Sequence, residues 1–529
     1  MAPPSTKLAN SLGTLKALQE QGVVAIRAAD LGRVHRERLV RNGFLQEVMK
    51  GWYIPAHPDS PAGESTAWYA SFWAFCAAYL EERFGDDWSL APEHSLSLHV
   101  GNRNVPRQLV VRSPKARNRP TPLPCGTSVL DIRATMPATR EARQQDGLRL
   151  FALPAALVAV PARFFAHNPT DARAALATIR AASEVLDPLL EGGHSTIAGR
   201  LAGAFRNIGR ARIADDILAA MRSAGYDVRE ADPFAARIDL ILPRREATPY
   251  AGRIRLMWQQ MRGPVSERFP ASPGRPNDIK AYLKRVADVY VTDAYHSLSI
   301  EGYRVSPELI ERVRGGNWNP DKDEQDREHR NALAARGYWQ AFRTVQKSLG
   351  RVLRAENPGT VADQDHGTWY REMFAPGIAA GLLRPGDLAG YRNAPVFIRQ
   401  SMHVPPRSEA VPDVMSVFFE MLEQETDPAV RVVLGHFIFV YIHPYMDGNG
   451  RMARFLMNVM LSAEGYPWTV VPLERRDAYM AALEDASTRQ NIVPFADFIG
   501  RLTDAGLKGR AAARVPAQTA RHARRPPSL

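Results

Sequence analysis

One stretch constrains this chain more than any other: residues 443–454, which read HPYMDGNGRMAR. Gly448, Asn449 and Gly450 tolerate left-handed backbone, so their consecutive N–H groups are able to converge into a concave anion-binding nest. Apolar residues then recur at helical spacing, at Met452, Phe455, Leu456, Val459 and Met460. The stretch therefore predicts a loop that opens a helix, and the N-terminal end of a helix favours phosphate.

Charged and titratable side chains surround this nest. Arg451 and Arg454 lie three residues apart on one helix face, where two guanidinium groups are placed to donate to successive phosphates. Asp447 is a hard oxygen ligand, suited to Mg²⁺ through one carboxylate together with nucleotide phosphates. His443 precedes the nest, where an imidazole is placed to take a proton from an incoming hydroxyl. The alternative interpretation is a surface helix cap with scattered charges.

The stretch resembles the signature of the Fic family, H-x-F-x-[D/E]-G-N-G-R-x-x-R, except that Tyr445 stands in the usual Phe position. Tyr445 keeps the aromatic ring that anchors the loop in the core. The common activity of the family is transfer of AMP from ATP to a Ser, Thr or Tyr hydroxyl of a protein. The resemblance implies His443 as the catalytic base, Mg²⁺ on Asp447, and ATP held by Gly448, Asn449, Gly450, Arg451 and Arg454.

A second pattern lies upstream of this stretch. We expect a helix from about Asn277 to Ile300, and it runs into Ser297-Leu-Ser-Ile-Glu301-Gly302. These six residues resemble the Fic inhibitory motif, [S/T]-x-x-x-E-[G/N]. The resemblance implies that Glu301 pairs with Arg454 and withholds it from the γ-phosphate of ATP, while Ser297 orients Glu301. The alternative is an ordinary helix end at which Gly302 terminates the helix.

The resemblance covers roughly residues 275–500 and implies two further functional elements. A short β-hairpin flap is expected at residues 395–399 and 402–406, where the backbone of Val396, Phe397 and Ile398 would hold an extended segment of the target protein by strand addition. Residues 476–483 resemble the family helix that borders the adenine, which makes Tyr479 a candidate flank of the base. Rival reactions known in the family are removal of AMP and transfer of phosphate or phosphocholine.

The N-terminal residues suggest a different module. From Ser11 to Pro55 we expect a helix, a short helix at 28–31, a basic helix over 33–42, and two strands at 44–48 and 52–54. This order resembles the winged helix of abortive-infection-type antitoxins. Residues 33–54 carry five basic residues against two acidic ones, as a phosphate-contacting module requires. The candidate DNA contacts are Arg33, Arg36, Arg38 and Arg41. The alternatives are a solvated docking helix, or a DNA-binding regulator whose Fic unit senses nucleotide.

Composition bounds the class of protein. A chain of 529 residues with 45% hydrophobic and 23% charged residues is typical of a soluble protein with about three domains. The net charge of +12 favours contact with nucleic acid or another acidic surface. Two cysteines, no signal pattern and no long apolar run predict a reduced, cytoplasmic location without a membrane partner. The oligomeric state stays open, with a homodimer as one option.

We therefore predict a multidomain, mainly α fold. Its parts are a winged-helix-like domain (1–60), a mixed α/β antitoxin-like region (61–190), a helical linker subdomain (191–275), an all-α Fic domain with the inhibitory helix and the β-hairpin flap (276–508), and a basic disordered tail (509–529). Within the mixed region, residues 95–100 and 108–111 are expected to be strands because they alternate or run apolar. His94 and His99 lack a third ligand at usable spacing, so we predict no metal site there.

Overall fold

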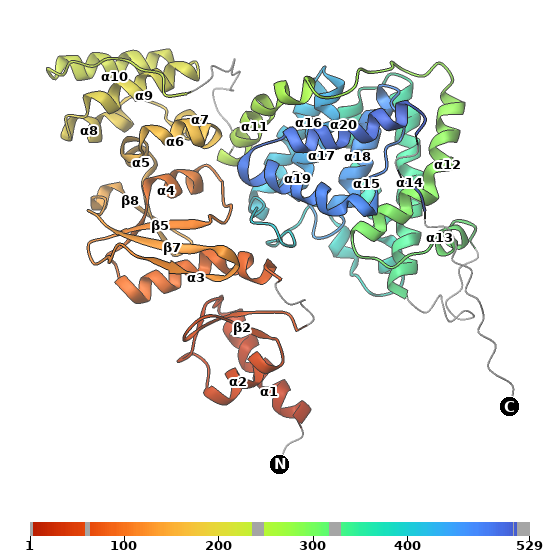
Figure 1. Ribbon diagram of the computed structural model, residues 1–529, viewed down its shortest axis with the longest axis horizontal. Coiled ribbons are helices and arrows are strands. Elements are labelled where there is room, and N and C mark those ends of the chain that lie inside the picture. Colours follow the sequence, from red (N-terminus) through yellow and green to blue (C-terminus); the bar gives the residue numbers. More distant parts are fainter. Residues whose placement is uncertain (1–3, 59–63, 235–247, 317–328, 511–512, 516–529) are drawn as a thin grey trace. The chain divides into compact units, whose positions relative to one another are not determined.

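The computed structural model describes residues 4–58, 64–234, 248–316, 329–510 and 513–515. The chain divides into two compact units, one formed by Met1–Gln260 with Asn393–Val414 and the other by Met261–Arg392 with Met415–Leu529. Helices predominate, as predicted, and the strands lie in the N-terminal part of the chain (Figure 1).

The N-terminal elements of the first unit enclose a small core of their own. They are α1 (Pro4–Glu20), β1 (Ile26–Arg27), α2 (Arg33–Arg41), β2 (Leu45–Met49) and β3 (Trp52–Pro55). The three strands form an antiparallel sheet in the order β1-β3-β2. The predicted hairpin is therefore confirmed, but the short helix expected at 28–31 is wrong. Those residues turn, because the Asp30 carboxylate accepts from the Arg27 backbone N–H at 2.8 Å and Asp30 N–H donates back to the Arg27 carbonyl at 3.0 Å.

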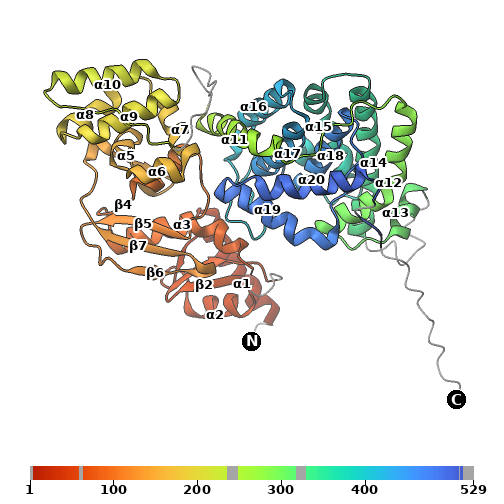
Figure 2. The same cartoon turned by 45° about the horizontal axis from the view of Figure 1, so that its top comes forward.

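A second layer of the first unit combines one long helix with a mixed sheet (Figure 2). Its elements are α3 (Thr66–Phe84), β4 (Ser89–Leu90), α4 (Pro92–His99), β5 (Gln108–Ser113), β6 (Pro120–Pro122), β7 (Ser128–Arg133), β8 (Ala142–Gln145) and β9 (Leu148–Phe151). Strands β5 and β7 pair in parallel, in the sheet order β4-β5-β7-β6. The aromatic residues of α3 pack on these strands around Trp68 and Phe75.

The strand predicted at 95–100 is wrong, because α4 occupies those residues. Pro92 sits in the first turn, where a missing N–H costs nothing. Leu96 and Val100, four residues apart, are buried in one hydrophobic cluster, whereas Leu98 is buried in another. Because this helix is buried on two sides, its apolar residues alternate with polar ones along the sequence, as they do in a half-buried strand.

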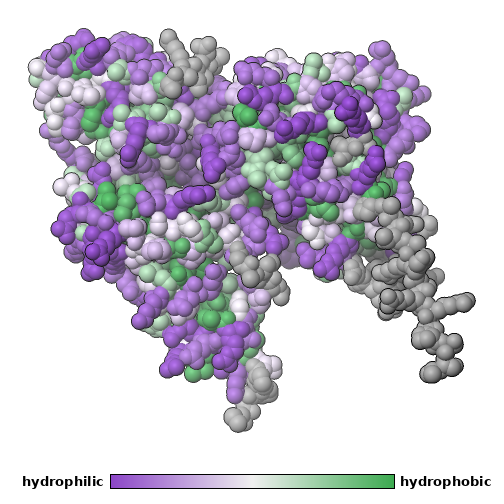
Figure 3. All heavy atoms as spheres, viewed as in Figure 1, coloured by the Kyte–Doolittle hydropathy of each residue, from purple (hydrophilic) through white to green (hydrophobic). Residues whose placement is uncertain are grey.

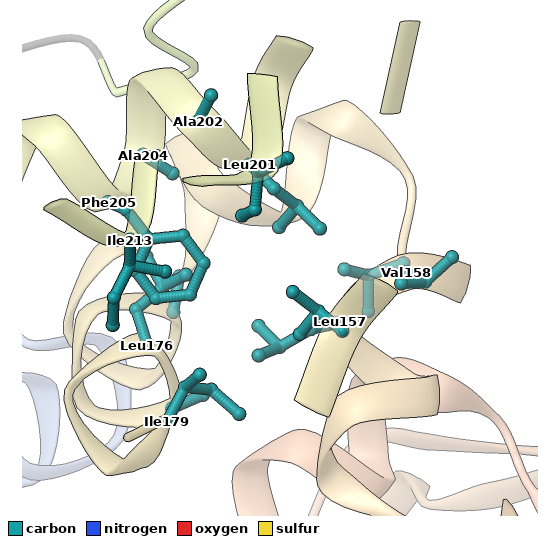
Figure 4. Packing of buried hydrophobic residues seen from close by; sticks show 14 of the residues in the cluster. Leu157, Val158, Leu176, Ile179, Leu201, Ala202, Ala204, Phe205 and Ile213 are labelled. Carbon is teal, nitrogen blue, oxygen red and sulfur yellow. The ribbon is translucent and has the colours of Figure 1, made fainter. Parts of the chain in front are cut away.

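Six short helices complete the first unit around one continuous core (Figure 4). They are α5 (Leu153–Ala159), α6 (Ala162–His167), α7 (Pro169–Thr178), α8 (Ser183–Glu191), α9 (Ser195–Asn207) and α10 (Ala211–Ser223). Phe205 and Ile213 from α9 and α10 share this core with Leu157 and Leu176 from α5 and α7. The domain boundary expected at residue 190 thus falls inside a single hydrophobic core.

The second unit is a helical assembly built around α17 and α18. After α11 (Pro249–Ser266), which spans the division between the units, its elements are α12 (Ile279–Ile300), α13 (Pro307–Arg314), α14 (His329–Leu353), α15 (Pro358–Ala379), α16 (Val411–Gln424), α17 (Pro428–Ile442), α18 (Asn449–Ala463), α19 (Arg476–Arg489) and α20 (Val493–Leu507). Helix α17 is buried along almost its whole length, and α18 packs against α17, α14 and α15 (Figure 1). The helix expected from about Asn277 to Ile300 is confirmed as α12.

The surface seen in Figure 3 is largely hydrophilic, with small groups of hydrophobic residues scattered over it. Within the described ranges, no helix is both long enough and apolar enough to cross a membrane. The basic tail predicted at 509–529 lies mostly outside the described residues.

Candidate active site

The loop between α17 and α18 carries the stretch on which the sequence analysis began. Helix α17 ends where His443 adopts a left-handed backbone conformation with φ 53°. Gly448 has φ 80°, and a Cβ there would lie 2.8 Å from the Phe374 ring, so this position requires glycine. Helix α18 begins at the next residue, Asn449. The predicted loop that opens a helix is confirmed.

Two side chains hold this loop in shape. Asn449 accepts from the Tyr445 backbone N–H at 2.9 Å and donates to the Tyr445 carbonyl at 2.8 Å. The Tyr445 ring stacks on Tyr370 with 3.8 Å between ring centroids, and Tyr445 is only 2% exposed. The aromatic anchor predicted at Tyr445 is confirmed, and Asn449 serves the loop backbone.

The His443 imidazole is set up as a neutral base. Its Nδ1 lies 3.2 Å from the Val440 carbonyl, so an Nδ1–H that donates there leaves Nε2 with a free lone pair. Burial lowers the pKa of His443 to about 4, and the Arg392 cation acts in the same direction. At neutral pH the ring therefore carries no charge and is able to accept a proton at Nε2.

Arg392 is a site residue that the sequence analysis missed. Its Nε donates to the His443 carbonyl at 2.8 Å, and its backbone N–H donates to the Pro444 carbonyl at 2.9 Å. A buried cation at the C-terminal end of α17 satisfies carbonyls that the helix leaves without partners. The only signal in the sequence was an arginine 51 residues before His443, and sequence spacing does not reveal which carbonyl such a cation reaches.

Arg451 is buried between two aromatic rings. Its guanidinium lies 5.2 Å from the ring centroids of both Tyr303 and Phe374, and the residue is 1% exposed. Its Nη2 donates to Asp447 at 3.3 Å, while the Asp447 carboxylate also accepts from the Gly448 N–H at 2.6 Å. Most of the Asp447 side chain is exposed, which leaves its oxygens accessible to a cation from solvent.

Arg454 is bound by the end of helix α12. Its Nη2 donates to Glu301 Oε1 at 2.7 Å and to the Ser297 carbonyl at 3.0 Å, and its Nε donates to Ser297 Oγ at 2.8 Å. Burial raises the pKa of Glu301, but the charges of Arg454 and Arg451 outweigh that effect and hold the pKa below its ordinary value. Glu301 is therefore an anion paired with a buried cation.

The Glu301 carboxylate lies directly on the glycine-rich turn. A Cβ at Gly450 would come 2.3 Å from Glu301 Oε1, which is possible only because residue 450 has no side chain. Helix α12 ends here because Gly302 has φ 87°, a conformation that glycine adopts without strain. The structure thus brings together Ser297, Glu301, Gly450 and Arg454, as the upstream pattern predicted.

The same site contains donors that lack acceptors. Arg451 Nε and Arg454 Nη1 are buried N–H groups with no hydrogen-bond partner among the residues that the structure describes. Buried donors of a charged group are almost always satisfied in proteins, so their presence indicates an anion at this position. Phosphate oxygens fit these donors, and Asp447 fits Mg²⁺ as the single carboxylate that such an ion takes beside phosphates. No cluster of three or more metal-ligating side chains occurs in the described ranges.

Tyr479 is brought near this region but lies in the core. It is 1% exposed, its hydroxyl is 2.7 Å from His436 Nε2, and its ring packs beside Phe495 and Phe498. Burial raises the pKa of Tyr479 to about 12, so its hydroxyl stays protonated. The adenine-flanking role of Tyr479 stays a prediction.

The expected flap differs in structure from the prediction. Residues 393–407 contain no strand, so the β-hairpin predicted at 395–399 and 402–406 is wrong. The chain does turn where Ser401 N–H donates to the Ile398 carbonyl at 3.1 Å. The segment is extended elsewhere because its backbone groups bond to the first unit, as in the contact of Val105 N–H with the Met402 carbonyl at 2.8 Å. Phe397 is 38% exposed, and its neighbours Val396 and Ile398 are half-buried.

Three of the four arginines proposed for DNA contact are engaged within the chain. Arg33 pairs with Glu37 at 2.7 Å, Arg36 donates to the Ala28 carbonyl at 2.8 Å, and Arg38 donates to the Lys7 carbonyl at 2.9 Å. Arg41 is exposed and has no side-chain partner in the described part of the chain. Arg36 and Arg38 therefore support the fold of the N-terminal elements, a role that charge counting does not reveal.

Comparison with known proteins assigns the class of this domain. Residues 368–461, which include the whole loop from His443 to Arg454, match the model of the Fic/DOC family. This part of the chain is therefore similar to proteins of the Fic/DOC family.

Curated relatives carry the same domain. The chain is 28% identical over 252 residues to "Protein adenylyltransferase Fic" of Nematostella vectensis, covering 46% of this chain and 54% of that protein. It is 27% identical over 231 residues to "Protein adenylyltransferase fic-1" of Caenorhabditis elegans, covering 43% and 42% of the two chains. The chain thus spans about half the length of the curated relatives it matches.

Among solved structures, "Fic-1 (aa134 - 508) from C. elegans" aligns with a TM-score of 0.35 at 17% identity, covering 68% of this chain and 90% of that chain.

Proposed function

We propose that this chain is an autoinhibited protein adenylyltransferase, which transfers AMP from ATP to a Ser, Thr or Tyr hydroxyl of a protein target. One observation carries the proposal: Glu301 is bound to Arg454 beside buried guanidinium donors that have no acceptor in the described structure. An anion site of this kind, one loop away from a neutral His443, matches what transfer at phosphorus needs.

In this mechanism His443 Nε2 takes the proton of the target hydroxyl. The hydroxyl oxygen then forms a bond to the α-phosphorus of ATP, while the bond from that phosphorus to the bridging oxygen of the β-phosphate breaks and pyrophosphate leaves. Mg²⁺, held by Asp447, would neutralise phosphate charge. The backbone N–H groups of Asn449 and Gly450 and the Arg451 guanidinium orient the α- and β-phosphates, while the Gly448 N–H donates to Asp447. Arg454 holds the γ-phosphate once Glu301 has withdrawn.

The position of Glu301 supports the autoinhibited form of this proposal. Its carboxylate lies against Gly450 and Arg454, and a γ-phosphate would meet both its volume and its negative charge there. The Glu301 side chain keeps 28% exposure at the end of a helix, whereas Arg454 is buried. Glu301 is therefore the partner that is free to move.

Labelling with ATP that carries a radioactive α-phosphate tests the proposal. Glu301→Gly is expected to label itself or an added lysate protein at least tenfold more than the unaltered chain, because loss of the carboxylate releases Arg454. Adding His443→Ala should abolish that label. Glu356→Gly, which removes an exposed carboxylate paired with Arg351, is the matched control and should behave as the unaltered chain. Equal labelling of the unaltered chain and Glu301→Gly would refute the inhibitory role.

AMP removal is the nearest rival reaction, because Glu301 and both arginines are present in one site. In that reaction Glu301 would orient a water molecule toward a modified target. Incubating the unaltered chain with target that Glu301→Gly has labelled distinguishes the two: release of labelled AMP, absent in His443→Ala, favours removal.

DNA remains a proposed second partner, supported by the net charge of +12. Because Arg36 and Arg38 hold the fold, the informative variant is Arg33→Glu with Arg41→Glu. If α2 contacts DNA, a gel shift by the full chain should weaken with added salt and weaken further, about tenfold, in this variant. A shift that is unchanged in the variant would exclude α2 as the contact.

A further inference from the structure

Helix α12 directs a third polar residue toward the same interior as Ser297 and Glu301. Asp293 lies one turn before Ser297, and the three residues are four apart, so they share a face of the helix. Asp293 is only 3% exposed, although a carboxylate is rarely buried without a reason. Neither the proposed mechanism nor the inhibitory motif uses it.

Asp293 is tied to the arginine site through α14. The Tyr338 hydroxyl donates to Asp293 Oδ2 at 2.6 Å, and Tyr338 itself is fully buried against Phe455 of α18. Ser297 Oγ, one turn further along α12, accepts from Arg454 Nε at 2.8 Å. Tyr338 also hydrogen-bonds with the Ser297 side chain, which joins Asp293 and Arg454 in one buried network. In this network the positive charge of Arg454 stabilises the ionised form of Asp293.

The two carboxylates near Arg454 differ in freedom. Glu301 caps the end of α12 and is partly exposed, so it is able to leave. Asp293 lies in the middle of the helix and is covered on all sides, so it stays wherever Glu301 goes. In a buried environment, a fixed carboxylate offsets part of the positive charge of a nearby cation. Any other anion is then attracted to that cation less strongly.

We propose that Asp293 is a positioning residue that acts through Arg454: its fixed negative charge limits how tightly Arg454 holds Glu301 at rest and the γ-phosphate of ATP afterwards. This inference rests on the proposed nucleotide site. Asp293 would then set the balance between the inhibited state, in which Arg454 binds Glu301, and the open state, in which Arg454 binds the γ-phosphate.

The network makes the effect of Asp293 dependent on pH. Burial raises the pKa of Asp293 to about 6, although the hydrogen bond from Tyr338 and the charge of Arg454 both lower it. The other titratable or charged groups that face it are Tyr290, Tyr338 and Arg454, and the pKa values of all three are raised. Among these groups only Asp293 changes charge between pH 5 and 8.

Nucleotide binding tests the inference without relying on AMP transfer. In the full-length Glu301→Gly chain, the ratio of the Kd for ADP to the Kd for ATP reports the γ-phosphate contact of Arg454, since ADP lacks that phosphate. Adding Asp293→Asn should raise this ratio about threefold to tenfold at pH 7.5, because Arg454 then holds the γ-phosphate more tightly. Asn keeps an acceptor for the Tyr338 hydroxyl, so the packing is conserved.

The pH profile separates this role from a structural one. As pH falls through 6, the Kd ratio of the parent Glu301→Gly chain should approach that of the chain that also carries Asp293→Asn. The reason is that Asp293 of the parent then becomes protonated and neutral. Protonation of ATP affects both proteins equally. Tyr338→Phe removes a donor to the carboxylate and should move the convergence to higher pH. This variant also tests the inference if Asp293→Asn does not fold. Asp288→Asn, on the exposed side of α12, is the control and should match the parent at every pH.

Each outcome decides between the claims. The role of Asp293 alone would be overturned if the ratio of the Kd for ADP to the Kd for ATP differed by a constant factor between parent and Asp293→Asn from pH 5.5 to 8. A lower ratio in Asp293→Asn than in the parent would overturn it too. Binding of both nucleotides without any AMP transfer would overturn the proposed function and leave the role of Asp293 standing. Failure of Glu301→Gly to bind ATP would overturn both.

Discussion

The guanidinium of Arg454 is the group on which the proposed site depends. It is buried, it donates to Ser297 and Glu301, and one of its N–H groups has no acceptor in the described structure. An ion pair of this burial is strongly destabilised when one partner is removed and the other stays unpaired. A γ-phosphate that replaces Glu301 avoids that cost, so nucleotide and inhibitory carboxylate are alternatives at one cation.

At the same scale, Arg392 determines where the proposed base points. Its Nε holds the His443 carbonyl, and its side chain is almost fully buried. Arg392→Lys keeps the charge but replaces a planar fork of donors with one ammonium group. In the Glu301→Gly background we expect kcat for AMP transfer to fall about tenfold, because His443 loses its fixed orientation.

The Kd for ATP should not change in Arg392→Lys. Arg392 contacts the carbonyls of His443 and Pro444, whereas the phosphates are proposed to bind at Arg451 and Arg454. Arg384→Lys serves as the control, because Arg384 is exposed and pairs only with Asp387 among the described contacts. Comparable losses in kcat and in ATP affinity would mean that Arg392 supports the fold rather than the orientation of His443.

At the scale of elements, sequence periodicity was reliable where a helix buries one side. Helix α12 was predicted within a few residues of its ends, and the Asp278 side chain that caps its start agrees with its apolar spacing. In the loop from His443 to Asn449, Gly448 adopts the left-handed conformation that glycine allows, whereas His443 is left-handed without being a glycine and Asn449 and Gly450 already belong to α18. In each case local chemistry and tertiary packing favour the same structure.

The failures occurred where two structures share one local pattern. Helix α4 is buried on two sides and therefore alternates as a strand does. Helix α15 begins at Pro358 because the Asn357 side chain accepts from the Gly359 and Thr360 N–H groups and caps it. The contact of Arg392 with His443 joins residues 51 apart, a separation that no local pattern encodes.

At the scale of the whole molecule, one segment does not belong where its sequence position suggests. Residues 393–414 lie within the sequence of the helical second unit, yet they pack as part of the first. Arg399 Nε donates to Glu64 at 2.9 Å, Gln400 N–H donates to Thr66 Oγ1 at 3.0 Å, and His403 Nδ1 lies 2.8 Å from Asn104 Oδ1. Met402 and Val404 pack on the aromatic core of α3.

This arrangement predicts that contacts with the rest of the first unit keep residues 393–414 ordered. The sequence analysis assigned part of this segment, Val396–Ile398, to target binding. The segment contains two trypsin sites, Arg399 and Arg407, and both side chains are ion-paired within the first unit, to Glu64 and Asp146. Cleavage after a paired arginine requires local unfolding of the segment, and its rate follows the free energy of that opening.

Replacing Glu64 and Asn104 with Ala removes two of these contacts without touching the helical unit. Trypsin should then cut the full-length variant after Arg399 about tenfold faster than the unaltered chain, as mass spectrometry of the fragments would report. Glu82→Ala, which breaks an exposed ion pair with Arg27 in the same unit, should leave the rate unchanged. Equal rates in all three chains would mean that the segment is ordered by its own backbone. In that case the first unit would not govern how a flap at Val396–Ile398 meets its target.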